Sequence, residues 1–339
     1  MTEANTPSEQ TGDGADQSSS EYIDDGPIII LGPTAAGKTA AAMAIQDWLG
    51  GPSKARLISA DSAMIYRGMD IGTAQPTANE LVGYPHDLID ILDPTQRYSA
   101  ADFVADADAC IARAIAKGQR PIVVGGTMLY IRCLLNGIAT LPESDPEQAR
   151  ALEQELQRDG SAAMHDELLR FDPAAAANIH PNNHQRLLRA VEVIRRTGQP
   201  LSQQWQESPG LPLELRLGVS PRVAAIVPRD RAALHQRIAQ RFDAMLHEGF
   251  LDEVRALRQR SDIHLDLPAM RAVGYRQAWR HLDGKTDAAA FREQAVAATR
   301  QLAKRQLTWI RQWPGMPTVH ADLLEPALQS LRELLRINL

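Results

Sequence analysis

The residues best suited to carry chemistry form a short run bounded by two glycines near the N-terminus. Gly32, Pro33, Thr34, Ala35, Ala36, Gly37, Lys38 and Thr39 match the spacing of a phosphate-binding loop. In such a loop the backbone N–H groups turn inward, the lysine neutralises phosphate oxygens and the threonine hydroxyl ligates Mg²⁺. The run therefore predicts a diphosphate site with Mg²⁺ as cofactor, and it leaves open whether the diphosphate belongs to a nucleotide.

Asp61 is the second candidate, because it follows an apolar run that begins at Leu57. We expect it at the carboxyl end of a strand beside the phosphate loop, where parallel sheets bind ligands. Three roles suit a carboxylate at that place: a ligand of Mg²⁺, a general base close to the reacting group, or the cap of a helix or turn. All three remain open at this point.

The elements that must position these residues alternate between strands and helices. Short apolar runs predict strands at 27–31, 57–60 and 122–124, and helical patterns follow the phosphate loop and cover 100–117. Such alternation is typical of a parallel sheet. The sequence therefore predicts an α/β fold with a parallel sheet core like that of P-loop NTPases.

Composition divides the chain into four regions. They are a disordered acidic tail at 1–25, the first part of the P-loop core at 26–139, a mainly helical insertion at 140–225, and a helical completion of the core at 226–339. The last region contains arginine-rich amphipathic helices at 231–258 and 287–313.

Charge is distributed unevenly behind a net charge of −6. Residues 1–180 contain 12 Lys and Arg against 26 Asp and Glu, whereas residues 181–311 contain 22 against 13. A basic block of this kind suits a surface that binds a polyanion such as nucleic acid. Solvated helix faces would give the same count, so charge alone leaves both interpretations open.

The compartment is inferred from what the sequence lacks. It has no run of 18 apolar residues and no secretory signal, so we expect a protein of the reducing cytoplasm with no membrane partner. Cys110 and Cys133 are interpreted as small buried apolar residues. Pro181 interrupts the helical spacing of His180 and His184, so no structural metal is expected. We expect a monomer.

A family resemblance rests on the run Asp-Ser-Ala-Met-Ile-Tyr-Arg-Gly-Met-Asp-Ile-Gly-Thr-Ala at 61–74. It resembles the second signature of the bacterial tRNA dimethylallyltransferases, also called tRNA isopentenyltransferases or the IPP transferase family, and the phosphate loop fits that family too. Further matching stretches follow in the family's order at 85–86, 98–99, 124–130, 179–182, 185–187, 273–277 and 299–306. Together they cover about residues 27–315.

The resemblance implies a reaction and assigns roles. The family transfers a dimethylallyl group from dimethylallyl diphosphate to the exocyclic amine of the adenosine 3′-adjacent to the anticodon of tRNA, and diphosphate leaves. The phosphate loop would then hold a prenyl diphosphate rather than ATP, with Lys38, Thr39 and Mg²⁺ serving the leaving group. Asp61 is implied as the general base, and Thr127 as a residue beside the reaction centre. Thr127 equally suits the N-cap of the helix that follows it.

Two arginines, Arg237 and Arg241, lie four residues apart on one helical face, and we expect one of them to clamp the diphosphate. Arg241 is included in the catalytic set with Asp61, Thr127 and Lys38.

The resemblance also implies a surface for the tRNA anticodon stem-loop. Its residues would be Asp61, Ser62, Ala63, Met64, Thr127, Gln185, Arg186, Leu187, Leu188, Arg189, Arg271, Ala272, Val273, Gly274, Tyr275, Arg276, Lys304, Arg305, Gln306, Leu307, Thr308, Trp309, Ile310 and Arg311. Arg300, Lys304 and Arg311 fall on one helical face and could line a rail for phosphates. We expect a flipped adenine to enter a channel, with the insertion closing over the anticodon stem.

Two other function classes use the same loop. A nucleotide or small-molecule kinase would place Asp61 on Mg²⁺. A nucleic-acid-binding protein switched by nucleotide would leave the Gly125-Gly126-Thr127 stretch unexplained.

Overall fold

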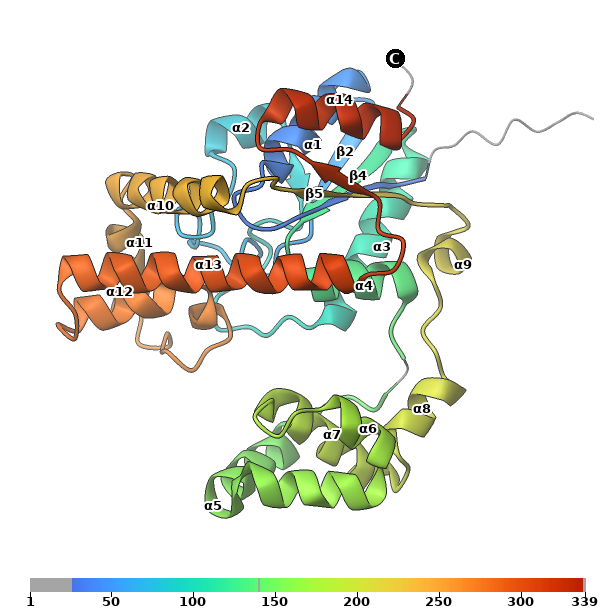
Figure 1. Ribbon diagram of the computed structural model, residues 1–339, viewed down its shortest axis with the longest axis vertical. Helices are drawn as coiled ribbons and strands as arrows, with labels where there is room; N and C mark the ends of the chain where they lie inside the picture. Colours follow the sequence, from blue (N-terminus) through green and yellow to red (C-terminus); the bar gives the residue numbers. More distant parts are fainter. Residues whose placement is uncertain (1–25, 140, 338–339) are drawn as a thin grey trace, which may run out of the picture.

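The computed structural model describes residues 26–139 and 141–337. The acidic tail expected at 1–25 lies outside the described residues. Figure 1 shows a larger body built on a sheet and a smaller group of helices that extends from it on two connecting segments.

One parallel sheet forms the centre of the larger body. Across the described ranges, six strands lie in the order β3 (His86–Asp87), β2 (Ala55–Ser59), β4 (Arg120–Gly125), β1 (Ile28–Leu31), β5 (Arg222–Val227) and β6 (Thr318–His320). The predicted α/β fold with a parallel sheet is confirmed. The expected strands at 27–31, 57–60 and 122–124 correspond to β1, β2 and β4. The other three have no counterpart among the expected strands, since β3 and β6 are very short and β5 follows a Pro- and Gln-rich stretch.

The order of the strands corrects one expectation. β4 lies between β2 and β1, pairing Ile122 with both Ile28 and Leu57. The strand that leads to Asp61 is therefore one strand away from the strand of the phosphate loop, not beside it. Parallel neighbours are joined by long crossover connections, so local sequence carries little information on their order.

Helices cover both faces of the sheet. This is expected because all four residues of β1 are apolar and successive side chains point to opposite faces. Ile28 and Ile30 pack toward one layer, and Ile29 and Leu31 pack toward the other. The first layer contains α1 (Lys38–Trp48) and α14 (Leu324–Leu334). The second contains α3 (Ala100–Ala116), α4 (Met128–Asn136), α10 (Arg231–His247), α11 (Phe250–Gln259) and α13 (Ala288–Gln312). Neither Cys110 nor Cys133 is in a disulfide.

The smaller body has its own hydrophobic core. It consists of α5 (Pro146–Phe171), which is interrupted at Gly160, with α6 (Pro173–Asn178), α7 (His184–Thr197) and α8 (Leu201–Glu207). Leu168, Leu187 and Val193 are fully buried among these helices. Helices of the insertion expected at 140–225 therefore form a group that packs around its own apolar side chains.

The end of that insertion differs from the expected residue 225. α9 (Leu213–Leu217) already lies on the larger body, because Arg216 pairs with Asp108 of α3 at 2.7 Å and donates to the Leu134 carbonyl oxygen of α4. β5 then begins at Arg222 inside the sheet. The stretch at 199–228, which is rich in Pro, Gln and Glu, thus contains both α9, docked on the larger body, and the strand β5.

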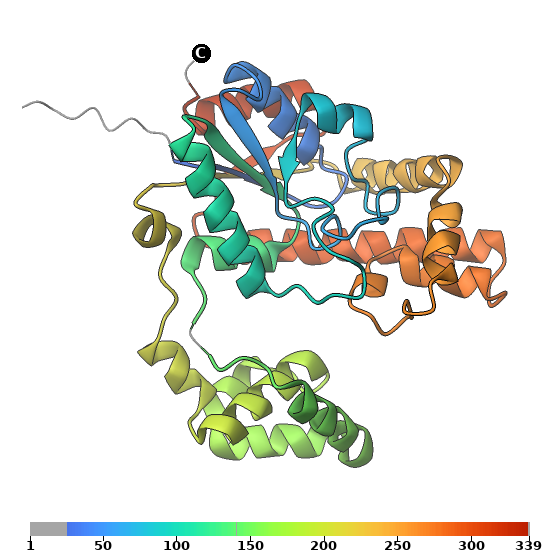
Figure 2. The same cartoon turned by 180° about the vertical axis from the view of Figure 1, so that it is seen from behind.

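The last third of the chain completes the larger body. The expected helix at 231–258 is divided into α10 and α11 at Gly249, whose φ of 99° is a conformation that favours glycine. A short helix η1 (Ala269–Arg271) leads into α12 (Tyr275–Leu282), and α2 (Ala78–Gly83) lies near the edge strand β3. Figures 1 and 2 show α10, α12 and α13 side by side. Among the described residues, no helix is long and apolar enough to cross a membrane.

Candidate active site

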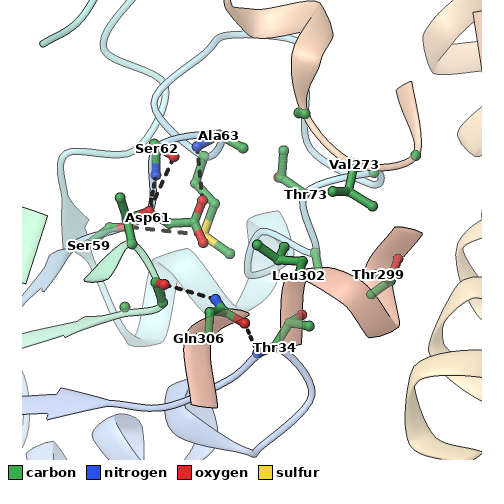
Figure 3. Close-up of a pocket in the computed structure, with 18 of the residues that line it drawn as sticks. Thr34, Ser59, Asp61, Ser62, Ala63, Thr73, Val273, Thr299, Leu302 and Gln306 are labelled. Carbon is green, nitrogen blue, oxygen red and sulfur yellow. Dashed lines mark hydrogen bonds between the residues drawn. The ribbon is translucent and has the colours of Figure 1, made fainter. Parts of the chain in front are cut away.

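A cavity of about 570 Å³ opens where the strands of the sheet end. It is lined by the phosphate loop after β1, by the loops after β2 and β4, and by residues of α10, α11, η1 and α13. Figure 3 shows the side chains of Asp61, Thr34 and Gln306 around one part of it. The carboxyl ends of parallel strands are the usual place for a ligand, so this cavity is the candidate active site.

The phosphate loop turns back on itself before α1 begins. Gly37 has a φ of 82° and immediately precedes the helix, and the Lys38 ammonium donates to the Pro33 carbonyl oxygen at 2.8 Å. Burial lowers the pKa of Lys38 to about 8, while the nearby carboxylate of Asp61 opposes that shift and Arg241 adds to it. A half-buried cation at the N-terminus of a helix provides a strong site for phosphate oxygens.

Both arginines of α10 reach the phosphate loop, and their positions separate their roles. Arg241 donates to the Thr34 hydroxyl and lines the cavity. Arg237 instead donates to the Ala35 carbonyl oxygen at 3.1 Å and pairs with Asp322 at 3.7 Å. Arg241 therefore lines the cavity in which a ligand would bind. Arg237 does not line the cavity and instead holds the backbone of the loop at Ala35.

The loop after β2 is joined to the loop after β4 by side-chain hydrogen bonds. The Thr127 hydroxyl oxygen accepts from the Ser62 backbone N–H at 3.0 Å and lies 3.2 Å from the Ser62 hydroxyl. Thr127 precedes α4 but makes no side-chain cap with it. The capping alternative for Thr127 is therefore not realised, and its hydroxyl fixes the residue next to Asp61.

Asp61 makes one backbone contact and lines the cavity. Its Oδ1 accepts from the Ala63 N–H at 2.9 Å, so the carboxylate does cap a turn. It also lies close enough to Lys38 and Arg241 to affect their pKa values. Figure 3 shows the Asp61 carboxylate joined to Ala63 by a dashed line. The turn contact positions the carboxylate and is compatible with either chemical role.

Beside the phosphate loop the cavity has an apolar wall. Ile238, Phe242 and Met245 of α10 form a stripe at positions i, i+4 and i+7, and Phe250 and Leu302 extend it. Phe242 meets Phe250 edge to face, with ring centroids 6.1 Å apart. The helical spacing of this stripe can be read from the sequence, but of the residues of α10 only the arginines were assigned a role in the site from sequence.

The far rim of the cavity is held by Glu253, a residue that sequence reasoning missed. Its carboxylate accepts from the backbone N–H groups of Asp70, Ile71 and Gly72 at 2.8, 2.7 and 3.1 Å, and from the Tyr275 hydroxyl at 2.7 Å. The segment that begins at Gly72 and the segment before Tyr275 both line the cavity. Glu253 therefore joins two parts of the rim that are distant in sequence.

The residues expected to bind tRNA divide by exposure. Leu187, Tyr275, Gln306, Leu307 and Ile310 have buried side chains, and of these five only Gln306 lines the cavity. Arg189 pairs with Glu192 and donates to the Pro142 carbonyl oxygen. The exposed members include Gln185, Arg186, Arg276, Lys304, Arg305, Thr308 and Arg311. Arg305 and Arg271 also line the cavity, whereas the expected residues of α7 do not.

The donors for a metal are few. Thr39 lines the cavity beside Lys38, and Ser59 and Asp61 add oxygen atoms. Within the described ranges there is no group of three or more His, Cys, Asp or Glu that could hold a metal ion. Mg²⁺ usually keeps several waters and is held by one or two protein oxygens together with substrate phosphates, so this donor set fits Mg²⁺ that arrives with a diphosphate.

Comparisons with known proteins agree with this geometry. A family model described as IPP transferase matches residues 64–313. A tRNA dimethylallyltransferase of Chromohalobacter salexigens is 53% identical over 305 residues, which cover 90% of this chain and 95% of the relative. One from Stenotrophomonas maltophilia is 54% identical over 290 residues, covering 84% and 89%.

Solved structures show the same likeness. A tRNA isopentenylpyrophosphate transferase of Bacillus halodurans superposes with a TM-score of 0.64 at 33% identity, covering 92% of this chain and 97% of that one. A eukaryotic dimethylallyltransferase acting on tRNA gives a TM-score of 0.70 at 25% identity, covering 84% and 69%.

Proposed function

Since this chain belongs to the IPP transferase family, we propose that it transfers a dimethylallyl group from dimethylallyl diphosphate to the exocyclic amine of the adenosine 3′-adjacent to the anticodon of tRNA. The products are N6-(dimethylallyl)adenosine in the tRNA and diphosphate. One observation carries the proposal: Asp61 lies in the same cavity as the phosphate-loop cation Lys38 and beside an apolar wall. A base, a leaving-group site and a prenyl site are thereby brought together.

The leaving group is held at the phosphate loop. As the bond between the allylic carbon and the diphosphate oxygen breaks, negative charge grows on the diphosphate. Lys38 and Arg241 stabilise that charge from within a cavity where both are largely removed from water. Mg²⁺ held through Thr39 would supply further neutralisation of the diphosphate.

The acceptor is activated on the other side of the cavity. The lone pair of an adenine amine is delocalised into the ring, so removal of its proton as the new N–C bond forms assists attack. Asp61 accepts that proton, and the hydrogen bonds from Ala63 to Asp61 and from Ser62 to Thr127 keep the carboxylate in place. The prenyl carbons lie along Ile238, Phe242 and Met245, where they are shielded from water.

The tRNA approaches from the rim that contains Arg271, Arg305 and the exposed face of α13. In this proposal the protein acts as a monomer. We place the activity in the cytoplasm, where tRNA is available. The smaller body of helices contacts the anticodon stem in this proposal, with Gln185 and Arg186 among its exposed polar residues.

The direct test is incubation of the protein with tRNA, Mg²⁺ and labelled dimethylallyl diphosphate. We expect label in the tRNA at the adenosine that follows the anticodon, with release of one diphosphate for each group transferred. Replacement of dimethylallyl diphosphate by ATP should give no phosphoryl transfer. ATP turnover without prenylation would overturn the proposal in favour of a kinase.

A further inference from the structure

Gln306 of α13 connects two loops of the cavity that are far apart in the sequence. Its side chain is buried, with Oε1 accepting from the Thr34 N–H at 2.9 Å and Nε2 donating to the Gly126 carbonyl oxygen at 2.8 Å. Figure 3 shows both bonds as dashed lines from the same amide. A neutral amide is well suited to this place, because it offers an acceptor to an N–H and a donor to a carbonyl.

Each of the two loops belongs to a different half of the reaction. Thr34 is in the phosphate loop, and its hydroxyl accepts from Arg241. Gly126 precedes Thr127, whose hydroxyl accepts from the Ser62 N–H next to Asp61. The amide of Gln306 therefore stands between the residues that hold the diphosphate and the residues that hold the base.

The fit around the amide is close. A Cβ atom added at Gly126 would lie 2.6 Å from Nε2 of Gln306, nearer than such atoms approach. The glycine thus leaves the space that the amide fills. Arg305, the residue before Gln306 in α13, lines the cavity, so this helix contributes both to the rim and to the loops beneath it.

On the proposed function, we propose that Gln306 is a positioning residue that fixes the separation between the diphosphate and the accepting amine. Gln306 lines the cavity, but both polar atoms of its amide are bonded to Thr34 and Gly126, so we assign it no hydrogen bond to either substrate. Its effect is on the alignment of the allylic carbon with the amine, and a misplacement of about 1 Å can slow such a step by about 10²-fold. The consequence is a defect in the chemical step while both substrates still bind.

The first variant is Gln306→Leu, which keeps much of the volume and removes both hydrogen bonds. We expect the single-turnover rate at saturating substrates to fall by about 10–100-fold, with dissociation constants for tRNA and dimethylallyl diphosphate little changed. The matched control is Gln46→Leu. Gln46 is a fully buried glutamine of α1 that also donates to a backbone carbonyl oxygen, Ala55 at 2.8 Å, but it does not line the cavity. Its variant should melt at a lower temperature and keep the wild-type rate per folded molecule.

The second variant, Gln306→Glu, separates positioning from simple loss of packing. The ionised carboxyl still accepts from Thr34 but opposes the Gly126 carbonyl oxygen, whereas the protonated carboxyl donates to that oxygen as the amide does. Burial raises the pKa of a carboxyl, so the ratio of variant to wild-type rate should rise as pH falls over about pH 6–9. The charged or titratable groups that share the cavity are Lys38, Asp61, His86, Arg241, Arg271 and Arg305, and they are the same in both proteins.

Three possible results test the positioning role of Gln306. A slow chemical step in Gln306→Leu together with recovery of Gln306→Glu at low pH supports the inference. A wild-type rate per folded molecule in Gln306→Leu, or a rate ratio for Gln306→Glu that does not vary with pH, overturns it while the proposed function stands. A wild-type protein that transfers no prenyl group overturns the proposed function and the inference together.

Discussion

The two sides of the cavity differ in how much of their bonding exists without a ligand. On the phosphate-loop side, Lys38, Arg237 and Arg241 each donate to an oxygen of the loop, and Gln306 binds it from above. On the α13 side, Lys304, Arg305 and Arg311 are exposed, and over the described part of the chain their charged groups have no hydrogen bond or ion pair.

This difference suits the size of the two ligands. Electrostatic stabilisation of a growing charge on a small leaving group is strongest when the donors are already oriented and desolvated. A long polyanion instead gains affinity by releasing counterions to solvated cations that line its path. In the proposed function, the pre-organised side performs the chemistry and the solvated side binds the tRNA. Four predictions test that division.

Asp61 stands where the two sides meet, and its substitution should have the largest effect. Asp61→Asn keeps the size of the side chain and an oxygen that accepts from Ala63, but removes the proton acceptor. We expect the single-turnover rate to fall by about 10²–10⁴-fold with both substrates still bound. The measurement is a rapid-quench assay across a Mg²⁺ series. Recovery of the wild-type rate at high Mg²⁺ would identify Asp61 as a metal ligand and contradict the role of base.

Lys38→Ala tests the pre-organised side alone. Loss of one cation beside the leaving group should reduce transfer by about 10²–10³-fold, because no water can replace it with equal orientation. The tRNA dissociation constant should stay close to that of the wild type. Lys54→Ala is the control, since Lys54 is an exposed lysine just before β2 and does not line the cavity. A Lys38→Ala protein that turns over normally would remove the phosphate loop from the site.

The pKa of Lys38, lowered by burial to about 8, gives a pH signature of the same side. Above that pH the free protein loses the ammonium, so kcat/KM for dimethylallyl diphosphate should fall by up to about tenfold per pH unit. The free energy of unfolding should change in the direction opposite to that of kcat/KM. Between about 8 and the ordinary value of 10.5 the unfolded chain binds more protons at this lysine, so the free energy of unfolding rises with pH. Lys38→Ala should lose both trends, and a wild-type kcat/KM that is constant to about pH 9.5 would contradict them.

Separation along the chain explains which features of the site could be predicted from sequence. The phosphate loop and Asp61 depend on short patterns, and the structure brings both into one cavity. The contacts of Gln306 and Glu253 join segments far apart in the chain, and nothing in their immediate neighbours in sequence indicates an amide or a carboxylate that bridges two loops. The family resemblance placed Gln306 among the tRNA contacts because it assigns a role to a whole segment. Burial instead differs from one residue to the next around a helix.

The order of the strands in the sheet likewise depends on contacts between segments that are distant in the sequence. A local apolar run identifies β1, β2 and β4, but the position of β4 between the other two depends on crossovers through α1 and α3. β5 also contains a continuous apolar run, but it follows a Pro-rich stretch and was therefore assigned to the insertion.

The last prediction concerns the solvated side and has the smallest expected effect. Lys304 and Arg311 lie on one exposed face of α13, so each is placed to bind a backbone phosphate of tRNA. Substitution of both by alanine should weaken tRNA binding and reduce the slope of log affinity against log salt by about 0.7–0.9 for each phosphate that the protein no longer neutralises. The dissociation constant for dimethylallyl diphosphate should not change, because neither residue lines the cavity.

The control for charge is the pair Lys54→Ala and Lys117→Ala. These exposed lysines precede β2 and β4, at the end of the sheet opposite the cavity, so their removal lowers the net charge equally without touching α13. Binding measured by fluorescence anisotropy from about 50 to about 200 mM salt separates the two effects. If both double variants reduce the slope alike, the basic block acts only through total charge. A reduced slope for Lys304 and Arg311 alone, with an unchanged single-turnover rate at saturating tRNA, would show that this face recruits the polyanion and leaves the chemistry to the pre-organised side.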